Sequence, residues 1–128
     1  MADLTSSFAV SASGMRSQAE RLRHVSENVA NADTPGYRRK TASFEPDRAG
    51  VDGAVRLGRV QLDRRETTRI YDPGHPLADD QGYHAGSNVD LVVEIADARE
   101  AQRSYAANLK MFDQARQMSS ALLELLRR

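Results

Sequence analysis

The feature that most constrains this chain is the confinement of its helix-breaking residues to the middle. All four prolines and seven of the eight glycines lie between residues 32 and 88. Proline interrupts a helix interior, and glycine weakens one. The sequence therefore predicts two long helices, within residues 1–31 and 88–128, and a middle region of residues 32–87 built from turns and short strands.

The first of these segments carries a narrow apolar stripe with a seven-residue period. That period is typical of a helix packed lengthwise against another helix. The helix should end before Pro35, because proline disfavours the helical conformation in the residue that precedes it. The stripe consists of Phe8, Met15, Leu22 and Val29, with Leu4 and Val25 one turn away on the same side.

The second segment repeats the pattern. Ser87 is the expected N-cap, with the carboxylate of Asp90 three residues on, as in a capping box. The ladder consists of Leu91, Ala98, Tyr105, Phe112 and Leu126, widened by Ile95, Leu109, Leu122 and Leu123. Neither helix is apolar enough to be stable alone. We therefore expect a mainly α fold, in which the terminal helices pair as an antiparallel, coiled-coil-like bundle and a small β/loop insertion lies between them.

Three stretches of the middle region have the composition of strands: Arg38–Phe44, Ala54–Leu62 and Thr67–Tyr71. The alternation of apolar residues changes phase at Gly58, which indicates a kink or bulge. Residues 46–53 are expected to form an exposed loop.

Charge is balanced overall, with 18 basic and 18 acidic residues, but unevenly placed. Residues 38–69 hold nine basic and five acidic side chains, a net charge of +4, whereas residues 72–100 hold one basic and seven acidic, a net charge of −6. We predict that the two stretches cannot pair fully within the small middle region, and that in a helical assembly the basic stretch of one copy contacts the acidic stretch of the next.

No constellation of residues predicts catalysis. There is no cysteine, and no phosphate-binding loop motif occurs. His24 is expected on the surface, Glu94 and Asp97 on a solvated helix face, and Arg38–Lys40 on a charged edge strand rather than at nucleic acid. We expect no enzyme activity, no cofactor and no small-molecule substrate.

One segment does contain metal-ligand residue types, namely Asp72, His75, Asp79, Asp80 and His84. Asp-Pro-Gly is strong turn chemistry, so a chain of turns is the simpler interpretation. A small metal-binding domain that uses Asp72–His84 remains the alternative from a different functional class. Near the N-terminus, the first basic residue is Arg16 and no apolar run follows, so we expect neither a cleaved signal peptide nor membrane insertion.

Residues 13–37 resemble the N-terminal motif of the flagellar rod and hook proteins. The most specific part is Asn28-Val-Ala-Asn31 followed by Thr34-Pro35-Gly36-Tyr37. Residues 88–108, from Asn88-Val-Asp-Leu to Tyr-Ala-Ala-Asn108, are similar to the C-terminal motif of the same family. The resemblance implies a structural subunit of the bacterial flagellar basal body, assembled helically with copies of itself and other rod proteins. It also implies a periplasm-spanning rod that transmits torque, and export by the flagellar type III apparatus.

Within that family, the short chain and the segment Tyr71–Tyr83 resemble a proximal-rod subunit. The compact turn at residues 32–36 instead resembles a sibling proximal-rod protein of the FlgB type, which stays as the alternative.

Overall fold

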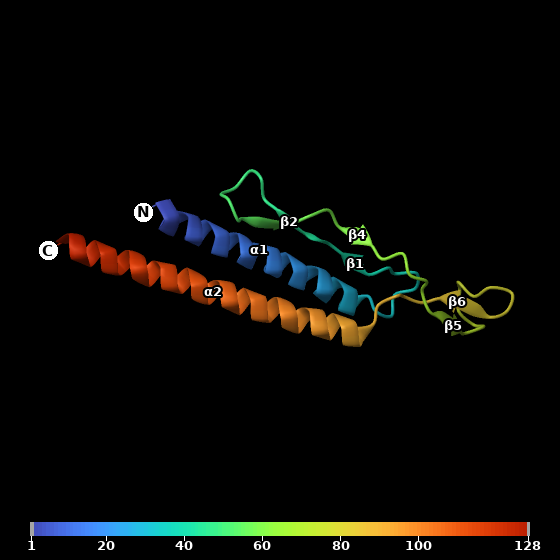
Figure 1. Cartoon of the computed structure of the whole chain (residues 1–128). Helices are drawn as coiled ribbons and strands as arrows, with labels where there is room; N and C mark the ends of the chain where they lie inside the picture. The colour runs from blue at the N-terminus through green and yellow to red at the C-terminus, as the bar shows by residue number, and fades with distance from the viewer. Residues whose placement is uncertain (1, 128) are drawn as a thin grey trace.

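The computed structural model describes residues 2–127, which contain two long helices and six short strands. The helices account for 29 and 37 residues, so the fold is mainly α with a small β-containing middle. They lie side by side, and both termini are found at one end of the molecule (Figure 1). In chain order the elements are α1 (Ala2–Ala30), β1 (Lys40–Thr41), β2 (Phe44–Pro46), β3 (Val55–Leu57), β4 (Gln61–Leu62), β5 (Arg69–Tyr71), β6 (Tyr83–Ala85) and α2 (Leu91–Arg127).

The end of α1 is fixed by the polar turn that the sequence predicted before Pro35. The Asn31 side-chain amide donates at 2.8 Å to the carbonyl of Glu27, which also accepts from the backbone N–H of Asn31 at 3.1 Å. The Asn31 side-chain oxygen accepts from the Thr34 hydroxyl at 3.1 Å. Gly36 then adopts φ +73°, and its N–H donates to the carbonyl of Gly86 at 3.1 Å. The turn therefore brings the chain against the segment that leads into α2.

The start of α2 differs from the prediction. Asp90, not Ser87, is the N-cap, because its carboxylate accepts from the N–H of Val92 at 3.0 Å. The Ser87 hydroxyl instead donates to the carbonyl of Ala32 and accepts from the N–H of Val89. A capping-box pattern identifies two candidate N-caps three residues apart. Here the Ser87 hydroxyl binds the turn after α1, so Asp90 caps the helix.

The described part of the middle region forms three two-stranded antiparallel sheets. Pairs β1–β4 and β2–β3 follow one another in a ribbon beside α1, on the side away from α2 (Figure 1). Gly58 lies between β3 and β4, and the ribbon is interrupted there, as the change of phase predicted. The third pair, β5–β6, forms a hairpin beyond the start of α2 (Figure 1). The strands are shorter than the predicted stretches, and β6 lies outside all three of them.

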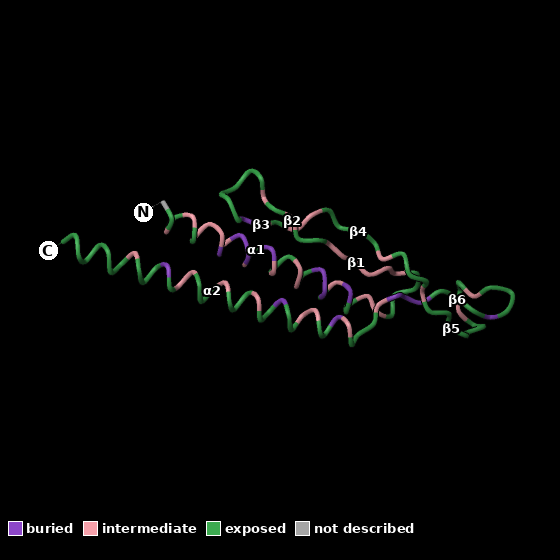
Figure 2. The backbone as a smooth tube through the Cα atoms, viewed as in Figure 1, coloured by how far each residue is buried: buried purple, intermediate pink, exposed green. Residues whose placement is uncertain are grey.

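The interior is small and polar rather than rich in large apolar side chains. Buried residues follow the inner side of α1, while most of α2 is exposed or intermediate (Figure 2). The buried apolar residues are Val25, Ala54, Ala101 and Ala115. The buried polar residues are Ser11, Ser13, Ser17, His24, Asn28, Ser87, Asn88 and Glu94. Neither helix, as far as residues 2–127 show, has an apolar stretch long enough to cross a membrane.

Candidate assembly interface

Asn28 joins three parts of the fold and is only 1% exposed. Its amide nitrogen donates to the carbonyl of Lys40 at 3.0 Å and to the carboxylate of Glu94 at 3.4 Å. Its oxygen accepts from the Tyr37 hydroxyl and from the N–H of Lys40, both at 2.8 Å. Burial raises the pKa of the Tyr37 hydroxyl above its ordinary value, which keeps it protonated as a donor. All the hydrogen-bonding capacity of the amide is used.

Glu94 is fully buried at the same junction, so its predicted place on a solvated face is wrong. The Arg39 Nε donates to the Glu94 carboxylate at 2.6 Å, and the Arg39 Nη2 lies 3.0 Å from the Asp97 carboxylate. The Arg39 side chain is 13% exposed, which also contradicts its predicted role on a charged edge strand. Burial lowers the pKa of Arg39, but the adjacent carboxylates outweigh burial and the net shift is upward. The guanidinium therefore stays charged and compensates the buried carboxylate.

Asn88, which belongs to the second sequence motif, also binds residues of this junction. Its oxygen accepts from the N–H of Arg39 at 2.7 Å, and its nitrogen donates to the carbonyls of Asp63 and Arg65 at 3.0 and 3.1 Å. The two motifs, separated by some fifty residues in the sequence, thus meet around one polar junction, which we call the Asn28–Glu94 junction. It holds the end of α1, strand β1 and the start of α2 together.

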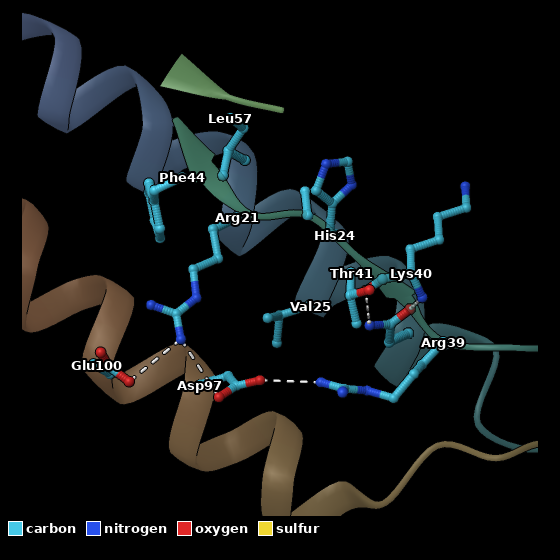
Figure 3. A pocket seen from close by; sticks show the side chains of 12 residues that line it. Arg21, His24, Val25, Arg39, Lys40, Thr41, Phe44, Leu57, Asp97 and Glu100 are labelled. Atoms are coloured by element: carbon cyan, nitrogen blue, oxygen red, sulfur yellow. Dashed lines mark hydrogen bonds and ion pairs between the residues drawn. The ribbon is translucent and has the colours of Figure 1, made fainter. Parts of the chain in front are cut away.

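A cleft of about 380 Å³ opens beside this junction. Figure 3 shows Arg21 reaching across it from α1 to Asp97 and Glu100 on α2, at 3.4 and 3.3 Å. The Arg21 guanidinium carbon also lies 5.9 Å from the centre of the Phe44 ring. His24 lines the cleft and is 8% exposed, so its predicted surface position is wrong. Its Nδ1 has no hydrogen-bond partner among residues 2–127.

Contacts between the helices show that they run in opposite directions. The rings of Phe8 and Phe112 meet edge to face, with centroids 4.9 Å apart. Further along α1, a methyl group added at Gly14 would lie 2.7 Å from the side chain of Asn108, so the two backbones approach closely there. At the far end, Asn28 contacts Glu94. The residue numbers on α2 decrease as those of their partners on α1 increase, so the two helices are antiparallel.

Most of the predicted assembly residues are exposed in the single chain. Val25 is buried at 7% exposure. Phe8, Met15, Leu22 and Phe112 are intermediate. The exposed ones are Val29 (43%), Leu91 (50%), Ile95 (52%), Tyr105 (38%), Leu109 (43%), Leu122 (42%) and Leu126 (78%). The single chain therefore leaves a large apolar surface on α2 without a partner.

The two charge patches are partly paired inside the chain. Arg39 from the basic stretch contacts Glu94 and Asp97 from the acidic stretch. Arg69 and Asp79 form a second pair of this kind at 3.1 Å. The pairing inside the chain is partial, and the contact between the basic stretch of one copy and the acidic stretch of the next stays a prediction. The sequence alone did not identify the Arg39 pairs, because they form only when α2, which carries Glu94 and Asp97, runs back beside Arg39.

The candidate metal segment forms the β5–β6 hairpin. The Asp79 carboxylate accepts from the N–H groups of Gln81 and Tyr83, each at 2.9 Å, and these backbone bonds lower the pKa of Asp79. The imidazole rings of His75 and His84 stack with centroids 4.0 Å apart. In residues 2–127 no group of three or more metal-ligand side chains has a geometry that could hold a metal ion. The segment is built as turns.

Sequence reasoning missed Glu94 and Asn88 as residues of the junction, and His24 as a residue of the cleft beside it. Nothing in the sequence indicates that a glutamate in the first turn of α2 is buried, because glutamate is also common on solvated helix faces. The signal that was available is the repetition of asparagine in both motifs, at Asn28 and Asn88. A buried asparagine amide has to be satisfied on both sides.

Comparison with known proteins matches both ends of the chain. A family model described as flagella basal body rod protein matches residues 8–38, and one described as flagellar basal body rod FlgEFG protein C-terminal matches residues 80–125. The flagellar basal-body rod protein FlgC of Agrobacterium fabrum is 41% identical, over 99% of this chain and 98% of the relative. The FlgC proteins of Salmonella typhimurium and Escherichia coli O157:H7 are 33% and 32% identical, each over 92% of this chain and 94% of the relative.

Proposed function

Since this chain belongs to the FlgC family of flagellar basal-body rod proteins and is a structural subunit of the rod, we propose that neighbouring subunits complete its helix pair into a coiled-coil-like bundle. In this proposal residues 1–31 and 88–128 form the assembly domain, and residues 32–87 form a middle region beside it. The full-length relatives are FlgC proteins, which favours this type over the sibling FlgB type.

The observation that supports the proposal is which residues the helix pair buries and which it leaves exposed. Apart from Val25 and the Phe8–Phe112 ring pair, the buried residues of the two helices are small or polar, such as Ser17, Ala101 and Asn28, whereas most large apolar side chains of α2 are exposed. A helix pair that functioned alone would bury its largest apolar residues between the helices. Exposed apolar surface of this extent marks an interaction site. The exposed ladder on α2 therefore supports packing against helices from other chains.

An apolar groove at the free end of the pair extends this surface. It has a volume of about 670 Å³ and runs between the first turns of α1 and the second half of α2. Its apolar lining residues are Leu4, Val10, Ala115, Met111, Met118 and Leu122. Methionine adapts its shape to different partners, so the groove suits contacts with more than one kind of rod subunit.

We also infer the place and the manner of assembly. The subunit would lie in the proximal part of the periplasm-spanning rod, arranged helically with copies of itself and with other rod proteins, and would transmit torque. It would be exported by the flagellar type III apparatus without a cleaved signal peptide. The role is mechanical, needs no catalytic residue and involves no cofactor, nucleic acid or membrane insertion. The Asn28–Glu94 junction suits it, because a satisfied buried polar network holds the helices in one register.

The test replaces two exposed apolar residues of α2 with aspartate, in the double variant Ile95→Asp/Leu109→Asp. Each side chain is already about half exposed in the single chain, at 52% and 43%, so the fold should survive. Burial of such a side chain at an interface contributes roughly 1.5–3 kcal/mol, so losing two should prevent assembly. The variant is expressed in cells that lack their own copy, and motility and its presence in purified basal bodies are measured. The matched control is Gln117→Asp on the same helix, which should swim normally. Normal motility of the double variant would refute the proposal.

A further inference from the structure

The β5–β6 hairpin projects past the helices at the end opposite to the termini (Figure 1). Its exposed apolar residues are Ile70 (42%), Tyr71 (63%), Leu77 (64%) and Tyr83 (37%). The rings of Tyr71 and Tyr83 lie 5.1 Å apart, and the Arg69 guanidinium carbon lies 4.9 Å from the centre of the Tyr83 ring. A two-stranded hairpin is only marginally stable in water unless its face is covered. This hairpin therefore offers an aromatic surface that a partner would stabilise.

The hairpin is also acidic. Residues 69–86 contain three carboxylates and one arginine, which gives 1 − 3 = −2 with neutral histidines. Asp79 is engaged by Arg69 at 3.1 Å. Asp72 and Asp80 are exposed, and neither forms an ion pair within residues 2–127. The partner of this tip should therefore be basic as well as partly apolar.

The same chain carries a surface of that chemistry on the outer face of α2. Arg99, Arg103 and Lys110 are spaced four and seven residues apart, so they share one face of the helix. This face lies opposite the one that Ala101 and Ala115 bury against the rest of the fold, since Arg103 is about 200° around the helix from Ala101. All three cations are exposed, and none forms an ion pair in the described part of the chain.

The outer face of α2 also fits the aromatic part of the hairpin. The small residue Ala106 is exposed between Arg103 and Lys110, and Ala96 is exposed one turn before Arg99, which leaves room for a ring to lie on the helix surface. Arginine and lysine attract aromatic faces. The stretch from Arg99 to Lys110 covers about 16 Å at 1.5 Å per residue, enough for a three-residue strand pair and its turn.

We propose that the acidic, aromatic β5–β6 tip of one copy docks on the basic outer face of α2 in a neighbouring copy. A chain cannot make this contact with itself, because its hairpin lies beyond the start of its own α2 (Figure 1). A contact between two different surfaces of identical chains is heterologous, and it propagates along a helical assembly. The inference rests on the proposed assembly of the subunit, and it names one pair of surfaces that would set the register between copies.

The first test exploits the absence of native cysteine. The double variant Leu77→Cys/Ala106→Cys is expressed in cells that lack their own copy, and basal bodies are purified and mildly oxidised. We expect a ladder of disulfide-linked multimers of this chain. The matched control is Leu77→Cys/Ser26→Cys, which places the second thiol on an exposed position of α1 and should give no ladder. An assembled variant without a ladder, also when the thiol is moved to positions 103 and 107, would overturn the proposal.

The second test exchanges the charges. Asp72→Arg/Asp80→Arg reverses the tip, and Arg99→Glu/Arg103→Glu reverses the helix face. Exposed ion pairs are individually weak, so we expect each double reversal to lower incorporation into basal bodies by roughly tenfold and a single reversal to change little. Combining all four substitutions should restore incorporation. A combined variant no better than either double variant would refute the contact. If wild-type chain is itself missing from basal bodies, the proposed function fails instead, which separates the two ideas.

Discussion

The buried pair of Glu94 and Arg39 gives the sharpest test of what holds the fold together. Glu94 is fully buried and keeps Arg39 at 2.6 Å, with Asn28 at 3.4 Å as its other partner. Arg39 has two further carboxylates, Asp97 at 3.0 Å and Asp63 at 3.7 Å. The two partners are therefore unequal. Removing the arginine leaves a buried charge with only an amide, whereas neutralising the glutamate leaves the arginine compensated.

We expect Arg39→Met to destabilise the fold by about 3–5 kcal/mol, the cost of leaving a buried charge uncompensated. Glu94→Gln keeps an oxygen acceptor and should cost about 1.5–3 kcal/mol, the range for a hydrogen bond to a charged group. The double variant Arg39→Met/Glu94→Leu replaces the pair by apolar side chains and should recover most of the loss. Glu100→Gln on the same helix is the control. Its side chain is 66% exposed, so it should cost no more than about 1 kcal/mol.

The assay is urea unfolding of the purified chain, followed by circular dichroism of the helices. With a slope of about 1–3 kcal/mol per molar urea, Arg39→Met should lower the midpoint by at least about 1 M. Hydrogen exchange of the amides in residues 95–107 should accelerate in the same variant. Equal midpoint shifts for Arg39→Met and Glu94→Gln, or no recovery in the double variant, would show that burial of the carboxylate does not decide stability here.

Three further results are expected. Gly36→Ala should destabilise by about 1 kcal/mol through its φ of +73° alone, since nothing lies within 4 Å to clash, and thermal unfolding would measure it. Backbone hydrogen bonds lower the pKa of Asp79, so its contribution to the hairpin is fully present above the ordinary aspartate pKa and is lost as pH falls below that value and through the lowered pKa of the folded chain. NMR of the Tyr83 amide should show this loosening, and Asp79→Asn should abolish the dependence. In the isolated chain, the amides of residues 119–127 should exchange faster than those of 95–107, because the Asn28–Glu94 junction lies at the other end of α2.

The two helices and the strands up to β5 were predictable because local rules decide them, whereas β6 was not predicted. The concentration of proline and glycine between residues 32 and 88 fixes where helices are allowed, and Pro35 fixes where α1 must stop. The interruption at Gly58 follows from the change of alternation. These features depend on residues close together in the sequence, so periodicity and turn chemistry are sufficient to place them.

The junction was not predictable, because it depends on which helix face returns past which strand. Glu94, His24 and Arg39 have side chains that are normally solvated, and only the tertiary arrangement buries them. A heptad pattern indicates that a helix has a helical partner, but it does not say whether the partner lies in the same chain. Here Ile95 and Leu109 remain about half exposed, so the pattern describes a surface that the single chain does not cover.

Polar contacts hold the helix pair together, and exposed apolar residues are left for other chains. This difference has a physical consequence for assembly. Apolar contacts are non-directional and would allow a helix pair to slide by a turn. Polar contacts have fixed geometry, so the bonds of Asn28 and Arg39 hold one register before any neighbour arrives. The apolar residues of α2 can then be buried between chains, where they would contribute to the free energy of association. If the arrangement were reversed, with an apolar inner contact and polar outer faces, the helix pair would be more stable alone and would have little left to gain from assembly.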